Sequence, residues 1–520
     1  MHDLTPQPDI SERIRLAYDP QMLACLIGEL TQLLPAHLRD VQAGNAHVLN
    51  WADPVSNTQR ARASLREDLH SQDPEQIRRD FRVLVQRMLD HGQNLHHPRY
   101  LGHQVPASVP IAALFDAVGS ITNQVMAIYE MGPWATSVER AMVEELGRCI
   151  GWQAGSFDGF VTHGGSLANL TALLTARNVA LENVWEHGLT GFQQPPVIVI
   201  HAEAHYAVTR AAAILGIGRQ HMIKAALDDK RRIDPQQLDI TLTDLKRAGH
   251  PIVAVSANAC ATPIGAFDPL EEIADVCQKH EVWLHVDAAH GGAALLSSRY
   301  RHLVAGIERA DSLVWDAHKM LFMPALCAFV FYRAREHRFE AFRQDAPYLF
   351  DPAAPGLAEY DSGMKTVECT KRAAAFGLWG CWSLFGRQLF EDLVDQTFDQ
   401  CRLLFQKLES APDFAPLHEP ECNILAFRYL PSELDTASAE EIGRFQLEVR
   451  RRIMISGEFY IVQTQAEGHG ALRVTIINPL TSEEHLDQLM LTVRRYGQQL
   501  LSEPNSTTHT QNSDGQPLPS

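Results

Sequence analysis

The residues of this sequence best suited to covalent chemistry are a lysine and an aspartate that each follow a short apolar run. Lys319 comes three residues after the run 312–316, and Asp287 ends the run 282–287. A lysine amine forms an imine with an aldehyde, and a carboxylate pairs with a protonated ring nitrogen. Two neighbouring strand ends that deliver these groups can hold one aromatic aldehyde from both sides, as pyridoxal 5'-phosphate (PLP) is held in proteins. The pair therefore predicts a PLP site.

A glycine-rich turn between a predicted strand and a predicted helix is suited to the phosphate of such a cofactor. Gly164 and Gly165 are followed by Ser166 and Asn169. Glycines let the backbone approach a ligand closely, and the free N–H groups and dipole of a helix start favour an anion. Ser166 and Asn169 could add hydrogen-bond donors. Such a turn is also ordinary structural punctuation, so its value depends on its neighbours.

Further residues with suitable chemistry follow other predicted strands. His205 lies just past the run 197–201, where its flat ring could stack on a pyridine or serve as an ordinary loop histidine. Thr262 follows the run 252–256, Ala289 follows Asp287, and His318 precedes Lys319. Ligands of open parallel sheets bind beyond the carboxyl ends of the strands. We therefore expect these residues to meet at one edge of a sheet.

The elements that must position them alternate between strands and helices from about residue 109 to 380, which predicts a mostly parallel sheet covered by helices. The predicted strands are 159–162, 197–201, 252–256, 282–287, 312–316 and 326–332, with helices at 167–180, 206–215 and 269–279. Residues 1–108 are predicted to be helical, with apolar residues at helical spacing over 14–34 and 77–89. Residues 381–499 predict a smaller α+β domain with strands at 423–429 and 471–477, and the polar tail 500–520 is predicted to be disordered.

Composition excludes several classes of protein. The formal net charge of the 520 residues is −18 with no long basic run, which argues against nucleic acid or an anionic membrane as a partner. No apolar stretch approaches the ~20 residues that cross a bilayer. The nine cysteines occur singly, without zinc spacing, which suits free thiols in a reducing compartment. With no signal-like start either, we expect a soluble cytoplasmic protein without a structural metal.

With these motifs in place, the chain resembles the group II PLP-dependent amino-acid decarboxylases from about His97 to Gln499. It is most similar to the branch that acts on glutamate, aspartate and cysteine sulfinate. The segments that carry the resemblance are 164–169, 265–270, 283–289, 306–309, 318–320, 359–363 and 477–479. The resemblance implies an α/β protein of PLP-dependent transferase fold type I. It also implies a homodimer with active sites at its interface, in which the N-terminal helical segment wraps the partner.

The resemblance also implies roles for individual residues. Lys319 would bind the cofactor aldehyde, Asp287 would pair with the pyridine nitrogen, and His205 would stack on the ring. Thr262 and Ala289 would flank the cofactor. The residues implied around the phosphate are Gly164, Gly165, Ser166, Asn169 and His318, together with Cys369 from the partner subunit.

Other residues would act on the amino-acid substrate. Tyr348 matches a mobile-loop tyrosine that returns a proton to the substrate carbon, where a phenylalanine would have indicated oxidative deamination. Arg473 matches an arginine that binds the α-carboxylate. His103 and Gln104 are the candidates for the side-chain pocket. The expected reaction is decarboxylation of an L-amino acid to an amine and CO2.

Two departures from the family pattern bear on the chemistry. Asp316-Ala317 replaces the usual Asn-Pro before His318-Lys319, which adds a negative charge near the imine. Gly102-His103 replaces an Asn-Gln pair of the glutamate decarboxylases, which leaves the substrate open. We expect an acidic substrate, while Val105-Pro106 resembles the aromatic branch and keeps an aromatic or 2,4-diaminobutyrate substrate as the alternative.

Four other interpretations stay open from sequence. The same fold could support another PLP reaction, such as transamination or oxidative deamination, or a scaffold without catalysis. A serine hydrolase would need a G-x-S-x-G elbow, and the segment 164–168 ends in alanine. A metal could be bound by the histidines His91, His96, His97 and His103.

Overall fold

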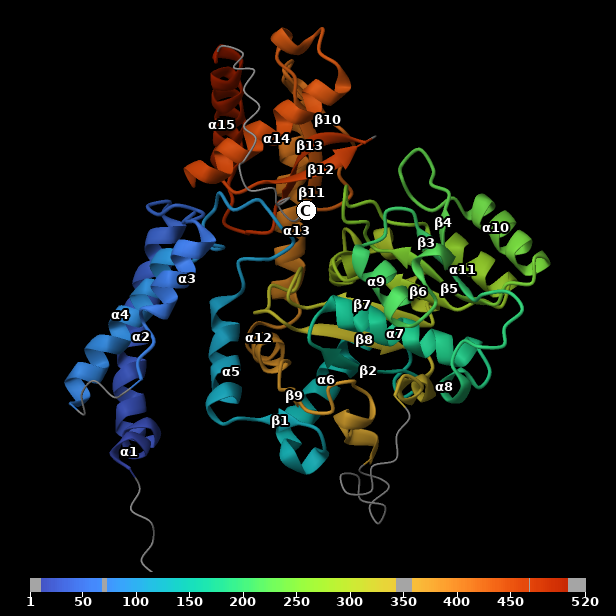
Figure 1. The fold of residues 1–520 in the computed structure, drawn as a ribbon, viewed down its shortest axis with the longest axis horizontal. Coiled ribbons are helices and arrows are strands. Elements are labelled where there is room, and N and C mark those ends of the chain that lie inside the picture. The colour runs from blue at the N-terminus through green and yellow to red at the C-terminus, as the bar shows by residue number, and fades with distance from the viewer. Residues whose placement is uncertain (1–10, 68–72, 343–357, 467, 504–520) are drawn as a thin grey trace, which may run out of the picture.

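A seven-stranded sheet forms the centre of the large domain in the computed structural model, which describes residues 11–67, 73–342, 358–466 and 468–503 (Figure 1). Its strand order is β2-β8-β7-β6-β5-β3-β4. The pairs from β7 through to β4 are parallel, whereas β8 is antiparallel to both β2 and β7. The strands are β2 (Asp158–Thr162), β3 (Val197–His201), β4 (Met222–Ala225), β5 (Ile252–Asn258), β6 (Leu284–Asp287), β7 (Ser312–Asp316) and β8 (Ala328–Tyr332). The predicted mostly parallel sheet is confirmed.

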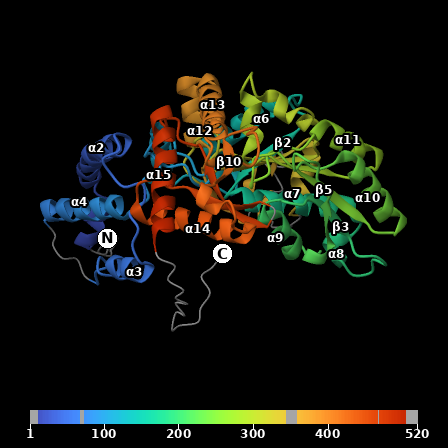
Figure 2. The same cartoon turned by 90° about the horizontal axis from the view of Figure 1, so that it is seen from above.

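Helices cover both faces of this sheet. Each strand accordingly buries side chains on both of its faces. Ile198 and Ile200 of β3 pack with α7 and α9, whereas Val199 packs on the opposite face with α6, α10 and α11. Figure 2 shows the sheet between these two helical layers. The helices are α5 (Pro110–Ile121), α6 (Pro133–Ile150), α7 (Gly165–Ala180), α8 (Val184–His187), α9 (Tyr206–Ile214), α10 (Pro235–Arg247), α11 (Leu270–Lys279) and α12 (Phe376–Phe385).

One short strand escaped the sequence analysis. β4 lies at the edge of the sheet and pairs only with β3 among the described strands. Its four residues include Lys224 and follow a 3₁₀ turn, so they lack the continuous apolar run of the other strands. The strand ends that carry the predicted site residues are therefore not consecutive along the chain, since β4 intervenes between those of His205 and Thr262.

The C-terminal domain is built on a four-stranded antiparallel sheet of order β10-β11-β13-β12. Its strands are β10 (Phe414–Pro416), β11 (Ile424–Tyr429), β12 (Val462–Ala466) and β13 (His469–Thr475), packed with α13 (Gln388–Ser410), α14 (Ala439–Ser456) and α15 (Glu483–Ser502). α15 continues past the expected start of the tail at residue 500, because Leu500 packs against the core of this domain. The rest of the predicted tail, 504–520, lies outside the described residues.

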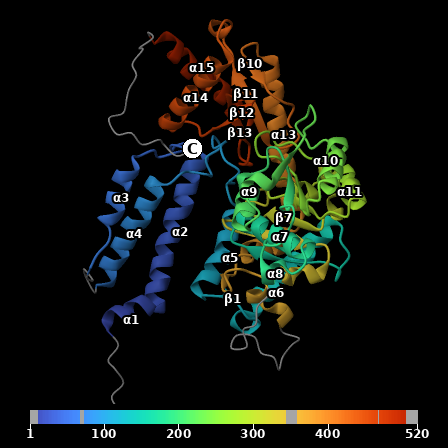
Figure 3. The ribbon, with the colours of Figure 1, turned by 45° about the vertical axis from the view of Figure 1, so that its right-hand side comes forward.

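The N-terminal segment is helical, as expected, and lies to one side of the large domain (Figure 3). Its helices are α1 (Glu12–Tyr18), α2 (Pro20–Gln42), α3 (Pro54–Arg62) and α4 (Pro74–His91). The apolar spacing over 14–34 suggested one helix, but Asp19-Pro20 starts a second one: the Asp19 side chain accepts the N–H of Gln21 at 2.9 Å. Among the described residues, no helix is both long and apolar enough to cross a membrane.

The chain between residues 95 and 109 joins the two domains. Leu101 donates its backbone N–H to Tyr460 and its carbonyl accepts from Thr475, so this segment extends the C-terminal domain. Asn478 donates its side-chain N–H to the carbonyl of His97 at 3.0 Å. Val109 then donates to Phe322, three residues after Lys319. His103 and Gln104 therefore lie between backbone contacts with the C-terminal domain and a backbone contact three residues beyond Lys319.

Candidate active site

A cavity of about 290 Å³ lies at the carboxyl ends of the central strands. It is the site at which ligands of such sheets bind. The predicted site residues that line it are Gly164, Gly165, Ser166, Asn169, His205, Thr262, Asp287, Ala289, His318 and Lys319. Gly164 and Lys319, 155 positions apart in sequence, thus meet through the sheet topology. The predicted convergence of strand ends is found in the structure.

Lys319 enters the cavity from the turn after β7. Its backbone N–H donates to the carbonyl of Asp316 at 3.2 Å, which closes the turn. Its Nζ lies 3.3 Å from Oδ2 of Asp316, so the carboxylate noted as a departure contacts the predicted cofactor amine. Asp316 itself is 2% exposed.

Asp287 is held as a hydrogen-bond acceptor in the cavity wall. Its Oδ1 accepts from the backbone N–H of Ala289, and its Oδ2 accepts from Asn169 Nδ2, both at 3.1 Å. Asn169 was predicted at the phosphate, and that role stays a prediction. Its amide donates to Asp287 and to the carbonyl of Gly165, and its oxygen lies 2.8 Å from His285 Nε2, so the residue also orients the carboxylate.

The contacts behind Asn169 form a chain of hydrogen bonds with one direction. Trp283 can only donate, so Ser312 Oγ accepts from it at 2.9 Å and donates its own hydrogen to His285 Nδ1 at 2.9 Å. His285 Nε2 then donates to Asn169 Oδ1 at 2.8 Å. Burial lowers the pKa of His285 to about 4, which keeps its ring neutral. The neutral ring accepts at Nδ1 and donates at Nε2. Both oxygens of Asp287 therefore accept hydrogen bonds from N–H groups. A carboxylate that pairs with a protonated ring nitrogen requires such an environment.

The start of α7 supplies an anion-binding turn. Gly164 has φ +108°, a backbone conformation that L side chains rarely adopt, and it caps α7. The first N–H groups of a helix have no intrahelical partners, and those of α7 belong to Gly165 and Ser166 at the cavity wall. A Cβ on Gly165 would lie 2.6 Å from Asp316 Oδ2, so a larger residue there would require the Asp316 carboxylate to shift. The geometry suits a phosphate.

His205 caps α9 at the same edge. Its Nδ1 accepts from the backbone N–H of Ala207 at 3.3 Å, which fixes the ring. Burial lowers the pKa of His205, so the imidazole is neutral and can lie against an aromatic ring. This position agrees with the predicted stacking role.

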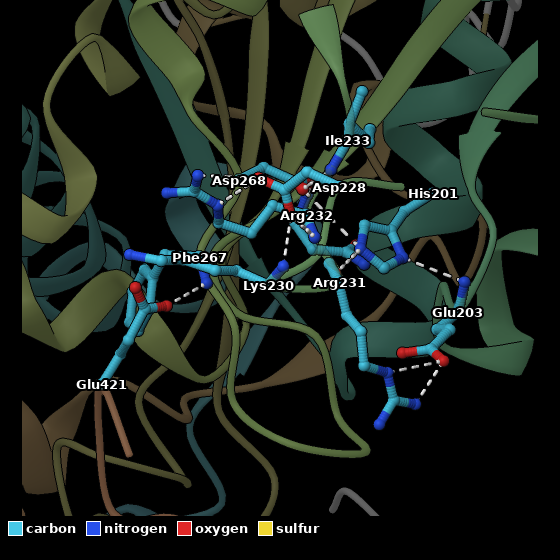
Figure 4. A network of polar contacts seen from close by, with 11 residues as sticks. His201, Glu203, Asp228, Lys230, Arg231, Arg232, Ile233, Phe267, Asp268 and Glu421 are labelled. Atoms are coloured by element: carbon cyan, nitrogen blue, oxygen red, sulfur yellow. Dashed lines mark hydrogen bonds and ion pairs between the residues drawn. The ribbon is translucent and has the colours of Figure 1, made fainter. Parts of the chain in front are cut away.

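A buried polar network holds the loops that follow β3, β4 and β5 (Figure 4). Asp268 accepts from the backbone N–H groups of Asn258 and Ile233, each at 2.7 Å, and burial raises the pKa of this carboxyl. His201, the last residue of β3, lies 3.1 Å from the carbonyl of Arg231 through its Nε2. The network positions the strand ends on which Asn258 and His205 lie.

Arg473 approaches the cavity from the small domain without lining it. It lies on β13, is 8% exposed, and donates from Nη1 to the carbonyl of Thr262 at 3.0 Å. Burial lowers its pKa to about 10. Its Nε has no hydrogen-bond partner among the described residues. A buried guanidinium with an unused donor beside the cofactor cavity suits a substrate carboxylate.

His103 and Gln104 do not line the lysine cavity either. The His103 ring lies 5.8 Å from that of Tyr460, between centroids. The pKa of His103 is lowered by desolvation and by the positive charges of Arg473 and Arg450, so both guanidinium groups lie near it. The two arginines are therefore cations near a histidine that desolvation keeps neutral.

Two further predicted residues, Cys369 and Tyr348, are not placed in the cavity by the described part of the chain. Cys369 lies outside the cavity wall of its own subunit, so its approach to a partner's phosphate stays a prediction. Its neighbour Glu368 contacts His163 at 3.0 Å, and His163 does line the cavity. Tyr348 lies outside the described residues.

The histidines considered for a metal have other partners. His91 Nδ1 lies 2.9 Å from the carbonyl of Arg87, and His96 Nε2 lies 2.9 Å from that of Ser108. His97 Nδ1 accepts from the backbone of Arg99 at 3.1 Å. Within the residues that the structure describes, no three His, Cys, Asp or Glu side chains come together as metal ligands.

Sequence reasoning missed several residues of the cavity wall: His163, Asn258, Cys260, His290 and Leu326. His290 is 3% exposed, and its Nε2 donates to Asn423 Oδ1 at 2.8 Å, since Asn423 Nδ2 donates to Ile476. Its Nδ1 has no partner among the described residues. Burial, with the charges of Lys319 and Arg473, lowers its pKa to about 3. None of these wall residues belongs to a recognisable motif. The sequence marked His163, Cys260 and His290 only by their positions shortly after strand ends.

The residues present fit PLP. Three buried polar atoms of the wall lack a partner in the described chain: Asn258 Nδ2, His290 Nδ1 and Asp316 Oδ1. Native proteins rarely leave such groups unsatisfied, so the wall is built for a polar ligand. A lysine, an oriented carboxylate, a neutral imidazole and an anion-binding turn surround it. Fold and site together define a PLP-dependent enzyme of fold type I.

Comparison with known proteins identifies the family within this class. Residues 59–430 match the pyridoxal-dependent decarboxylase conserved domain, more than half of the chain. The chain belongs to this family and is a PLP-dependent amino-acid carboxy-lyase. It is 31% identical over 458 residues to the mouse acidic amino acid decarboxylase GADL1, covering 86% of this chain and 81% of that protein. The human protein of that name is 30% identical over 457 residues, 86% of this chain and 85% of its own.

Solved structures of related proteins have the same fold. The crystal structure of mouse CSAD has a TM-score of 0.83 and 27% identity, and covers 92% of this chain and 99% of that one. The Oryza sativa TDC with PLP and tryptamine has a TM-score of 0.83 at 20% identity, covers 95% of this chain and all of that one, and supports the fold alone.

Proposed function

We propose that the enzyme decarboxylates an acidic L-amino acid, glutamate, aspartate or cysteine sulfinate, to the corresponding amine and CO2. The observation that carries this proposal is Arg473, a buried guanidinium that contacts Thr262 of the cavity wall and whose Nε has no partner among the described residues. An acidic amino acid brings two anionic groups and needs a cation for each. The likeness to acidic amino acid decarboxylases supports the same substrate class.

Each residue of the site has a task in this reaction. PLP, when bound, supplies an aldehyde for amines and a ring that accepts the electron pair of the broken bond. Lys319 would bind it, and Asp287, oriented by Asn169, would stabilise positive charge on its ring nitrogen. His205 would lie against the ring and exclude water. The first N–H groups of α7 would hold the phosphate.

Arg473 orients the bond that breaks. Its guanidinium is fixed by Thr262, a residue of the cavity wall, so a carboxylate bound to it has a defined direction. Decarboxylation requires the bond from Cα to the carboxylate to lie perpendicular to the cofactor ring. We assign that alignment to Arg473. Proton return to Cα is assigned to Tyr348 on the resemblance to the family.

Arg450 is our candidate for the second carboxylate. It lies on α14 and donates from Nε to the carbonyl of Ile461 at 3.3 Å, next to Tyr460 and hence near His103. It has no carboxylate partner in the part of the chain that the structure describes. Its neighbour Arg451, by contrast, pairs with Glu448. This difference makes the two arginines a matched pair for mutagenesis.

We further propose that the protein acts as a homodimer in the cytoplasm. α1, α2 and α4 expose large apolar side chains: Tyr18, Ile27, Leu34, Val83 and Met88 are each more than 40% exposed. An apolar surface of this extent on helices that lie beside the main body is typical of a protein interface. All nine cysteines are free thiols, which suits a reducing compartment.

The test is a screen of purified enzyme with PLP, which measures CO2 and the amine product. We expect turnover of L-glutamate, L-aspartate or L-cysteine sulfinate. Turnover confined to L-tryptophan, L-tyrosine or L-2,4-diaminobutyrate would refute the substrate class and leave the reaction standing. Arg450→Gln should raise KM for the acidic substrate about tenfold with kcat nearly unchanged, and Arg451→Gln should leave both unchanged. Equal effects of both changes would remove Arg450 from the proposal.

A further inference from the structure

Asp316 brings a buried carboxylate against the cofactor lysine. It is the last residue of β7, and its backbone N–H donates to the carbonyl of Ala289 at 3.2 Å. Its Oδ2 lies 3.3 Å from Lys319 Nζ and 3.6 Å from His318 Nε2. Because the backbone N–H of Lys319 also donates to the Asp316 carbonyl, one short turn holds both side chains together.

The two carboxylates of the cavity wall differ in their partners. Both oxygens of Asp287 accept from protein N–H groups. Asp316 has only Lys319 and His318 near Oδ2, and its Oδ1 has no hydrogen-bond partner among the described residues. A buried carboxylate with an unused oxygen is costly unless a cation compensates it. The ammonium of Lys319 is the cation in contact with it.

We propose that Asp316 is a positioning residue that holds Lys319 as an ammonium whenever the lysine nitrogen is not bonded to the cofactor. This inference rests on the proposed function in taking Lys319 as the cofactor lysine, and it is independent of which amino acid is the substrate. Whenever its nitrogen is unbonded and protonated, Lys319 would stay in the cavity wall, paired with Asp316 at 3.3 Å.

The same ion pair affects the phosphate end of the cavity. A Cβ on Gly165 would lie 2.6 Å from Oδ2 and 2.9 Å from Oδ1 of Asp316, so the carboxylate adjoins the start of α7. A phosphate bound there faces a second anion, and like charges at such separations repel strongly in a buried site. The ammonium of Lys319 neutralises Asp316 and permits the phosphate to bind. Lys319 thus contributes to cofactor binding before any covalent bond forms.

A double-mutant cycle on the cofactor-free enzyme tests this coupling. The probe is pyridoxine 5'-phosphate, which carries the ring and phosphate but no aldehyde. We expect Lys319→Ala to weaken its binding about tenfold or more, because Asp316 is left uncompensated, and Asp316→Asn/Lys319→Ala to restore it to within about threefold of the parent. Equal binding by Lys319→Ala and the double variant would overturn the proposal, as would absence of binding to the parent enzyme.

A second experiment reads the charge of Lys319 directly. Acetic anhydride labels only the uncharged amine, and peptide mass spectrometry measures the labelling rate at position 319 against pH. We expect Asp316→Asn to move the midpoint of this profile to lower pH, because removal of the anion destabilises the ammonium. The charged and titratable groups that face Lys319 in the cavity are Asp316, His318, His205, Cys260, Asp287 and His290, with Arg473 beyond them.

The matched control is Asp311→Asn, which removes the same charge just before β7, where Asp311 pairs with Arg333. Its midpoint should equal that of the parent. Unfolding would raise the maximal labelling rate rather than shift the midpoint. An unchanged midpoint in Asp316→Asn would overturn the proposal. Both experiments omit substrate, so their failure is distinct from a failure of the decarboxylation screen.

Discussion

Asn169 donates its side-chain N–H to Oδ2 of Asp287 across 3.1 Å. Its own oxygen accepts from His285, which in turn accepts from Ser312. Asp287 is therefore the last acceptor in this series of hydrogen bonds. It cannot share a proton with Asn169, which only donates to it. The electron-accepting strength of the site therefore depends on residues that never touch the substrate.

Asn169→Leu should lower kcat on the order of 100-fold, because it removes the donor that orients Asp287. The measurement is kcat together with the pH dependence of the bound cofactor's absorbance. Ser312→Ala, at the far end of the chain, should lower kcat less than about threefold. Equal losses in the two variants would show that the chain does not act through Asn169.

Gly165→Ala should weaken PLP binding about tenfold or more, because the new Cβ would lie 2.6 Å from Oδ2 of Asp316. The dissociation constant for PLP, measured from its absorbance, checks this. The double variant Gly165→Ala/Asp316→Ala removes the obstructing oxygens and should recover much of the affinity. A double variant as weak as Gly165→Ala would place the obstruction elsewhere.

Arg473→Lys should raise KM for the substrate about tenfold or more while the dissociation constant for PLP stays nearly constant. A lysine cannot hold the Thr262 carbonyl and a carboxylate in the fixed geometry of a guanidinium. Arg473 does not line the cofactor cavity, so cofactor affinity is the internal control. A parallel loss of PLP affinity would contradict the assignment to the substrate.

Acid should destabilise the protein through buried neutral histidines. Burial lowers the pKa of His97 from 6.5 to about 4. The unfolded state binds more protons between these two values, so the stability that the neutral ring contributes is present above pH 6.5 and is lost as the pH falls towards 4. The loss from this residue amounts to up to about 3 kcal/mol. Denaturant unfolding of His97→Gln between pH 7 and pH 4 should show a shallower slope, by about one proton, and an identical slope would contradict the prediction.

The sequence was sufficient for the fold and for most of the cofactor wall, because the chemistry follows the strand ends in chain order. Lys319, Asp287 and His205 lie where the sequence analysis expected them to meet. Contacts between domains could not be predicted from the sequence. That Arg473 donates to Thr262 depends on how the small sheet packs on the large one. That Arg450 lies near His103 depends on how the chain around Leu101 pairs with the C-terminal domain.

Side-chain orientation also escaped prediction. Asn169 follows the glycine turn by a few residues and was grouped with the phosphate, yet one turn of helix directs its amide to Asp287. His290 gave no motif, since its importance lies in a nitrogen that the fold leaves without a partner. The departure at Asp316 was visible in the sequence, and only the 3.3 Å contact with Lys319 gave it a role.

The backbone pairing of Leu101 with Tyr460 and Thr475 has a consequence for how the enzyme handles its substrate. His103 and Arg473 belong to one mechanical unit, although some 370 residues of chain separate them. Any rotation of that unit against the central sheet moves both side chains together, away from or towards Lys319. One movement of this unit therefore changes both the choice of amino acid and its alignment over the cofactor. A mutation that loosens residues 95–101 would impair both functions at once.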